Sequence, residues 1–164
     1  MSGGIDSLAM LESQHREIEK LFDELEQTSG VRKRKQFLDL ADKLAIHSTI
    51  EERDFYPAVR ATNTERLVSG ALEEHLGIGR GLANMLAVDI EDEAFDAKVR
   101  ELRARVEHHI LEEESHLFPE VRRLLDDATS TAIARQMAAT QEELIAEMRL
   151  RDAVPYETKR AAEL

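Results

Sequence analysis

Two copies of one short motif each place a histidine and a glutamate four residues apart. The first copy contains His47 and Glu51, the second contains His109 and Glu113, and in both a proline follows ten residues after the histidine. Residues four apart lie on one face of an α-helix. Imidazole and carboxylate groups are metal ligands, and two such pairs on neighbouring helices can converge inside a bundle. The motif therefore predicts a buried metal site.

Two further histidines extend this pattern. His15 and His75 each stand in an apolar stripe, where leucine or isoleucine would be expected, and they lie 60 residues apart. His47 and His109 lie 62 residues apart, so the chain reads as a duplicated helical hairpin. Buried imidazoles and carboxylates are costly without partners, and metal binding satisfies all of them together. The predicted ligands are His15, His47, Glu51, His75, His109 and Glu113.

The elements that must position these ligands follow from the apolar spacing, which is helical almost throughout. Short polar connectors separate four long segments, so neighbouring helices should run antiparallel. The fold class predicted is therefore all-α, an up-down antiparallel four-helix bundle. The expected helices run from about Leu8 to Ser29, from Phe37 to Pro57, from Glu65 to Leu86 and from Val99 to Leu125.

A polar break after Leu125 precedes a fifth helical segment. Its apolar residues include Ile133 and Met137, and Pro155 is expected to end it. We expect three parts: a bundle over residues 1–128, an additional C-terminal helix over 129–154 and a charged tail over 155–164. The extra helix should pack on the bundle or on a partner subunit.

The composition excludes several classes of function. A net charge of -12 over 164 residues argues against a nucleic-acid surface or binding to anionic membranes. No apolar run approaches the ~20 residues of a membrane span. The first residues lack the basic and apolar regions of a secretion signal, and the sequence contains no cysteine for disulfides or thiolate sites. We expect no nucleic-acid partner, no membrane partner and a cytoplasmic location.

The chemistry of the ligand set narrows the choice of metal. Four imidazoles are too nitrogen-rich for Ca²⁺ or Mg²⁺, which prefer oxygen. A single Zn²⁺ would use about four ligands and leave two carboxylates stranded. Two irons bridged by two carboxylates use the whole set, while two manganese ions or a mixed pair remain open.

With this order of ligands, residues 8–125 resemble the hemerythrin-like proteins of the HHE cation-binding family. The resemblance implies a cofactor of two iron ions (Fe²⁺/Fe³⁺). The two histidines of the first hairpin would hold one iron, and those of the second hairpin would hold the other. Both glutamates would bridge the irons, beside an oxo, hydroxo or water bridge.

One position departs from the family's oxygen carriers. The hemerythrins of marine worms have a fifth histidine one turn after the third-helix histidine, where this chain has Gly79. Open metal positions favour a diatomic or peroxide ligand and redox turnover. We therefore expect a non-haem di-iron protein that reduces or senses H₂O₂, O₂ or NO, with catalase-like, peroxidase-like or NO-related activity if it is an enzyme. The alternative is a non-catalytic O₂, NO or iron sensor or carrier that signals through the C-terminal helix. Monomer and homodimer both fit.

The neighbouring polar residues and glycines leave several interpretations open. Gly77, Gly79 and Gly81 can provide an opening beside the metals or allow close helix packing. His116 and Tyr56 are the candidates for a catalytic proton-relay or hydrogen-bonding role, against surface and packing roles respectively. The residues expected to face solvent are Glu52, His108 and Glu114, and Glu74 is left without a role.

Overall fold

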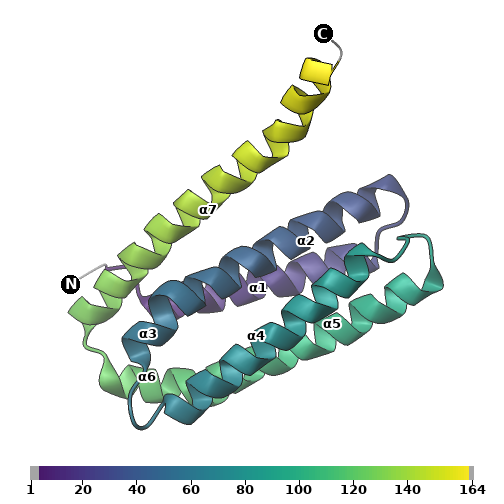
Figure 1. Cartoon of the computed structure of the whole chain (residues 1–164). Helices are drawn as coiled ribbons and strands as arrows, with labels where there is room; N and C mark the ends of the chain where they lie inside the picture. The colour runs from purple at the N-terminus through teal and green to yellow at the C-terminus, as the bar shows by residue number, and fades with distance from the viewer. Residues whose placement is uncertain (1–3, 163–164) are drawn as a thin grey trace.

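The computed structural model describes residues 4–162, with side chains described up to residue 149. Four long antiparallel helices form the bundle, which confirms the predicted fold class (Figure 1). α1 pairs with α2, and α4 pairs with α5. The four helices are α1 (Ser7–Glu26), α2 (Val31–Ile50), α4 (Glu65–Leu86) and α5 (Glu93–Glu112).

Two of these helices continue beyond a short π-helical turn. α2 leads through η1 (Glu51–Phe55) into α3 (Tyr56–Val59), and α5 leads through η2 (Glu113–Leu117) into α6 (Phe118–Leu124). In η1 the backbone N–H of Tyr56 donates to the carbonyl of Glu51, and in η2 Phe118 donates to Glu113 in the same way.

The prolines of the two motif copies explain why both turns widen. A proline inside an α-helix lacks an N–H group, and its ring clashes with the carbonyl four residues earlier. Pro57 and Pro119 each stand two residues after their π-helical turn, and a wider turn relieves that clash. The widening also changes the side-chain phase, so that Glu51 and Tyr56, five residues apart, both face inward.

The helix starts are fixed by polar side chains. Asp6 caps α1 by accepting from the Leu8 N–H (3.1 Å), and Asp92 caps α5 by accepting from the Ala94 N–H (3.0 Å). Thr64 directly precedes α4, but its hydroxyl donates to the Val59 carbonyl (2.7 Å) and does not cap the helix. This contact closes the turn between α3 and α4.

The predicted ligands separate two apolar clusters of the core. Along α1, Leu11 belongs to one cluster and Ile18 to the other, with His15 between them. Along α4, Ala71 and Ile78 flank His75 in the same way. The bundle thus holds a layer of polar side chains between two apolar regions of the core.

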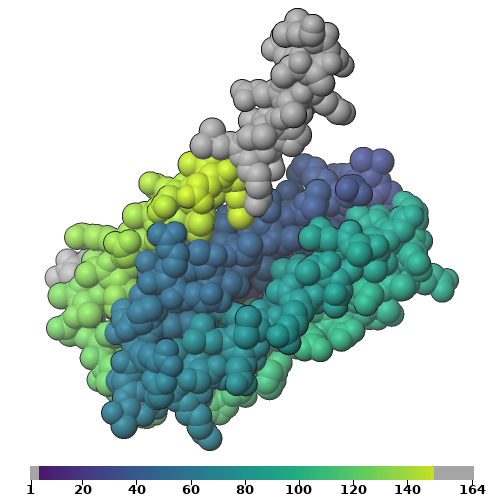
Figure 2. All heavy atoms as spheres, in the orientation of Figure 1, coloured from purple at the N-terminus to yellow at the C-terminus, as the bar shows by residue number. Residues whose placement is uncertain are grey.

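The fifth helix, α7 (Asp127–Ala162), packs against the bundle. Ile133 and Met137 are buried in the core cluster that also contains Leu11, and Arg53 of η1 lies 3.6 Å from Glu143. Figure 2 shows the first part of this helix lying along the flank of α2. The prediction that Pro155 ends the helix is wrong, because α7 continues to Ala162. A proline removes one helical hydrogen bond, and a longer helix can accommodate that loss.

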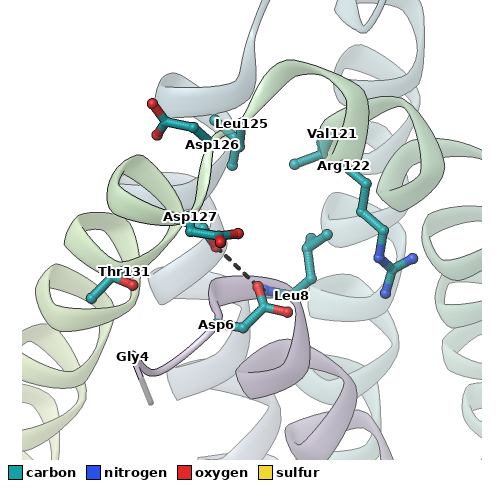
Figure 3. Close-up of a pocket in the computed structure, with 10 residues that line it drawn as sticks. Gly4, Asp6, Leu8, Val121, Arg122, Leu125, Asp126, Asp127 and Thr131 are labelled. Carbon is teal, nitrogen blue, oxygen red and sulfur yellow. Dashed lines mark hydrogen bonds between the residues drawn. The ribbon is translucent and has the colours of Figure 1, made fainter. Parts of the chain in front are cut away.

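The first turns of α7 are tied to the start of α1. The Ser130 hydroxyl donates to Asp6 (2.9 Å), and a cavity of about 400 Å³ lies beside this contact (Figure 3). No predicted ligand lines this cavity. Within residues 4–162, no helix is both long and apolar enough to span a bilayer.

Candidate metal centre

All six predicted ligands lie together at the centre of the bundle. Each is at most 7% exposed. Each of the four bundle helices, α1, α2, α4 and α5, contributes one of the four histidines, and the π-helical turns contribute the two glutamates. The helical spacing therefore places all six side chains in one buried layer, as predicted.

Four of these side chains form the first group, which we call half-site 1: His15, His47, Glu51 and Glu113. One ligand atom of each lies within 4.8 Å of the others. His47 Nε2 is 3.1 Å from Glu51 Oε1, and His15 Nε2 is 3.2 Å from Glu113 Oε2.

The second group, half-site 2, contains His75 and His109 together with Glu51. His75 Nε2 lies 3.0 Å from Glu51 Oε2 and 3.1 Å from His109 Nε2. One oxygen of Glu51 therefore faces half-site 1 while its other oxygen faces half-site 2. A carboxylate in this position can bridge two cations.

Half-site 1 contains buried donor atoms whose bonding needs a metal ion would meet. Four of its buried atoms have no aligned hydrogen-bond partner among the described residues. A buried polar atom without a partner costs about 1–3 kcal/mol, and one cation would satisfy all four. Mixed imidazole and carboxylate donors suit iron, manganese, cobalt and zinc. The four atoms are His15 Nε2, His47 Nε2, Glu51 Oε1 and Glu113 Oε2.

The outer nitrogens of two histidines bind carboxylates from the opposite hairpin. His15 Nδ1 donates to Glu114 (2.8 Å), and His75 Nδ1 donates to Glu52 (2.8 Å). Both glutamates were expected to face solvent, and each is partly exposed, Glu52 at 47% and Glu114 at 28%; the π-helical turns nevertheless bring their carboxylates to histidines of the adjoining helices. The Glu-Glu doublet in both motif copies was the signal in the sequence. Such contacts leave Nε2 free to bind a metal.

The outer nitrogens of His47 and His109 each contact a residue of their own hairpin. In both hairpins this residue stands directly before the first histidine. His47 Nδ1 donates to Gln14 Oε1 (2.7 Å). His109 Nδ1 lies 3.3 Å from Glu74 Oε2, as a close ion-pair contact without hydrogen-bond alignment. The sequence reasoning assigned no role to Gln14 or Glu74. Their shared position directly before His15 and His75 could have revealed them.

Tyr56 is a buried neighbour of both glutamates. Its hydroxyl donates to Glu113 Oε1 (2.6 Å) and lies 3.2 Å from both Glu51 Oε2 and His75 Nε2. Its counterpart in the second copy is Phe118, whose ring stacks on His15 with the centroids 5.9 Å apart. A phenol therefore lies beside half-site 2, while an apolar ring lies beside half-site 1.

Burial and neighbouring charges act in opposite directions on the pKa values of His15 and Glu51, but in the same direction on that of Tyr56. Burial lowers the pKa of His15, but Glu113 and Glu51 outweigh it and raise the pKa to about 10. Burial raises the pKa of Glu51, but the surrounding histidines, His47 foremost, hold it well below its usual value. Burial and the two carboxylates together raise the pKa of the Tyr56 phenol. Without a metal, the centre is thus held together as an ion-pair cluster that contains a protonated phenol.

The remaining histidines lie outside the centre. His116 is 57% exposed and lies 3.4 Å from Glu112, and His108 is exposed. The structure therefore places His116 on the surface, away from the ligand atoms.

The opening to the centre is not where the alternating glycines suggested. Gly77 and Gly81 line a groove of about 230 Å³ that has none of the six ligands in its wall, and Gly79 is exposed. A different cavity of about 290 Å³ reaches His109 and Glu113. Gly70, which lacks a side chain, forms part of its wall. Because the groove follows the outer seam between α4 and α5, the three glycines do not open onto the ligands.

This chain is similar in fold or in sequence to known proteins. A solved structure with the same fold is a hemerythrin HHE cation binding domain-containing protein from Mycobacterium kansasii, described as an Rv2633c homolog. It shares 24% sequence identity with this chain at a TM-score of 0.79, and the match covers 90% of this chain and 93% of that one. A "DNA nickase" of Nostoc sp. (strain PCC 7120) is 28% identical over 131 residues, which are 79% of this chain but 37% of the relative. The chain therefore spans little more than a third of that protein.

The family model described as "Hemerythrin HHE cation binding domain" matches residues 6–121. This range contains α1 to α5 and all six predicted ligands. The chain, a metal-binding helical bundle, belongs to the hemerythrin HHE cation-binding family.

Proposed function

We propose that this chain is a non-haem di-iron protein that binds and reduces, or senses, a small oxidant such as H₂O₂, O₂ or NO. The observation that carries the proposal is the set of four buried donor atoms in half-site 1 that have no hydrogen-bond partner among the described residues. One of them is an oxygen of Glu51, whose other oxygen faces half-site 2. Two irons held there would supply two electrons to an oxidant. Manganese or a mixed pair fits the same donors.

Different residues of the chain would bind the metal in each half-site. His15 and His47 would hold the metal of half-site 1, and His75 and His109 would hold that of half-site 2. Glu114 and Glu52 keep the proton of His15 and of His75 on Nδ1, so that the Nε2 of each would be available to bind a metal. We propose that the bundle over residues 1–128 forms this centre and that α7 is an added element.

Small ligands would enter through the cavity beside Gly70, because its wall includes His109 and Glu113. A Cβ at Gly70 meets nothing within 4 Å, so Gly70→Leu should fold and fill the passage. We expect slower binding of H₂O₂ or NO at unchanged metal content. Gly79→Leu, at an equally open position of the same helix but remote from the cavity, is the control. Equal binding rates in both variants would exclude this route.

Tyr56 is the proposed proton donor for a ligand at half-site 2. Its raised pKa keeps the phenol protonated at neutral pH, and its hydroxyl lies within hydrogen-bond distance of Glu113, Glu51 and His75. Proton delivery assists the cleavage of an O–O bond, since the leaving oxygen then departs as water or hydroxide. Phe118 offers no such proton beside half-site 1.

One observation favours the second candidate, a sensor that signals through α7. Gln141 of α7 accepts a hydrogen bond from Gln14, and Gln14 accepts one from His47. A change in the centre therefore has a direct route to the C-terminal helix. The nicking activity named for the Nostoc relative is not part of this proposal, since the chain covers 37% of that protein and has a net charge of -12.

The deciding experiment loads the chain anaerobically with Fe²⁺ and exposes it separately to H₂O₂, O₂ and NO. Rapid H₂O₂ consumption with O₂ release supports the enzyme. A change in the visible spectrum without consumption supports the sensor. The absence of any spectral change or turnover with all three ligands would overturn both.

A further inference from the structure

In both hairpins, the residue directly before the first histidine contacts the second histidine. The two residues at this position carry different chemical groups. Gln14 precedes His15 and accepts the Nδ1–H of His47 (2.7 Å). Glu74 precedes His75 and lies 3.3 Å from the Nδ1 of His109. One partner is a neutral amide and the other is a carboxylate, so the two halves of the repeat differ in charge at matching places.

This difference makes the surroundings of the two half-sites unequal. In half-site 2 both outer nitrogens face a carboxylate: Glu52 accepts the Nδ1–H of His75, and Glu74 lies 3.3 Å from the Nδ1 of His109 as a charge contact without hydrogen-bond alignment. In half-site 1 only His15 has one, Glu114. A carboxylate on the outer nitrogen makes an imidazole a stronger metal ligand, and losing such a partner typically changes metal affinity about 10–100-fold.

The amide of Gln14 also connects half-site 1 to the C-terminal helix. Its Oε1 accepts from His47, and its Nε2 donates to Gln141 Oε1 on α7 (3.2 Å). The Gln14 side chain is buried and both ends of its amide are engaged, so these two contacts fix its orientation. α7 therefore holds Gln14, and Gln14 holds the ring of His47. Glu74, by contrast, lines the open cavity beside half-site 2.

We propose that the two half-sites bind metal unequally. Half-site 2 binds the first metal tightly, and half-site 1 binds the second more weakly, with an affinity that depends on the docking of α7 through Gln141 and Gln14. Gln14 is a positioning residue in this scheme. The inference rests on the proposed function, because it presupposes two metals.

The test titrates the metal-free full chain with Co²⁺ against a competing chelator. Ring ¹H–¹⁵N spectra of the histidines identify which pair is filled at each step. We expect two binding steps that differ at least tenfold, with His75 and His109 perturbed first. Glu74→Gln, which keeps the shape of the side chain, should weaken the first step about 10–100-fold. Gln14→Glu should strengthen the second.

Gln141→Ala tests the connection to α7. It should weaken the second step alone, whereas Glu142→Ala, at the next and exposed position, should leave both steps unchanged. Two equal steps, filling of His15 and His47 first, or equal effects of Gln141→Ala on both steps would overturn the inference while leaving a di-metal centre in place. Binding of one metal per chain overturns the di-metal proposal and this inference with it.

Discussion

Replacing Tyr56 by phenylalanine removes a single oxygen from the centre of the proposed mechanism. That oxygen donates to Glu113 Oε1 (2.6 Å) and lies 3.2 Å from Glu51 Oε2. The ring itself is buried and stays in place, so the packing changes little. The variant therefore isolates the hydroxyl.

Tyr56→Phe should change two measurable quantities, the free energy of unfolding and the rate of peroxide turnover. In the metal-free protein, the Glu113 carboxylate loses the hydrogen bond that the Tyr56 hydroxyl donates to it, and the loss of a hydrogen bond to a charged acceptor costs about 1.5–3 kcal/mol of unfolding free energy. In the iron-loaded protein this loss should be smaller, because a metal would then engage the Glu113 carboxylate. The loss of a general acid should lower the rate of peroxide turnover about 10²–10⁴-fold.

The assays are urea denaturation with and without metal, and H₂O₂ consumption at matched iron content. Phe118→Leu is the control, since it disturbs the ring that stacks on His15 but removes no proton donor. We expect its turnover to stay within a few-fold of the unaltered chain. Wild-type turnover by Tyr56→Phe at equal iron content would refute the assignment of Tyr56 as donor.

Three further predictions concern stability. The pKa of His15 is raised from 6.5 to about 10. Protonated His15 therefore stabilises the metal-free fold fully below pH 6.5, and a few kcal/mol should be lost as the pH rises toward 10. A urea midpoint that stays constant over this range would contradict the ion-pair cluster. Met137→Ala should cost about 2–5 kcal/mol in urea denaturation, because Met137 is fully buried between α7 and the bundle; a cost below about 1 kcal/mol would show that α7 is not docked there. Gly79→Ala should raise the unfolding free energy by about 0.5–1 kcal/mol, as its Cβ meets nothing within 4 Å; a destabilised variant would mean that this face is packed.

The ligand layer was predictable because helical spacing alone determines which side chains share a face. His15 and His75 interrupt apolar stripes, and that is visible without knowing how the helices pack. The aromatic-proline pairs after Glu51 and Glu113 are visible too. Their consequence, a π-helical turn, depends on the clash between a proline ring and the preceding helix backbone, and a regular helical period does not report that clash.

The outer contacts depend on distances between helices. Glu52 reaches His75, and Glu114 reaches His15, across the gap between the two hairpins. On its own helix, each glutamate is only the neighbour of an inward-facing residue. The spacing within one helix therefore does not predict which histidine it contacts. The cavity beside Gly70 likewise reflects how α4 meets η2, which the spacing of apolar residues does not determine.

The most direct test of the central claim is a crystal structure of the iron-loaded chain with anomalous scattering recorded at the iron edge. We predict two iron peaks per chain, one against His15 and His47 and the other against His75 and His109. The Glu51 carboxylate should contact both irons. A single peak, or two peaks that Glu51 does not join, would contradict the carboxylate-bridged di-iron centre.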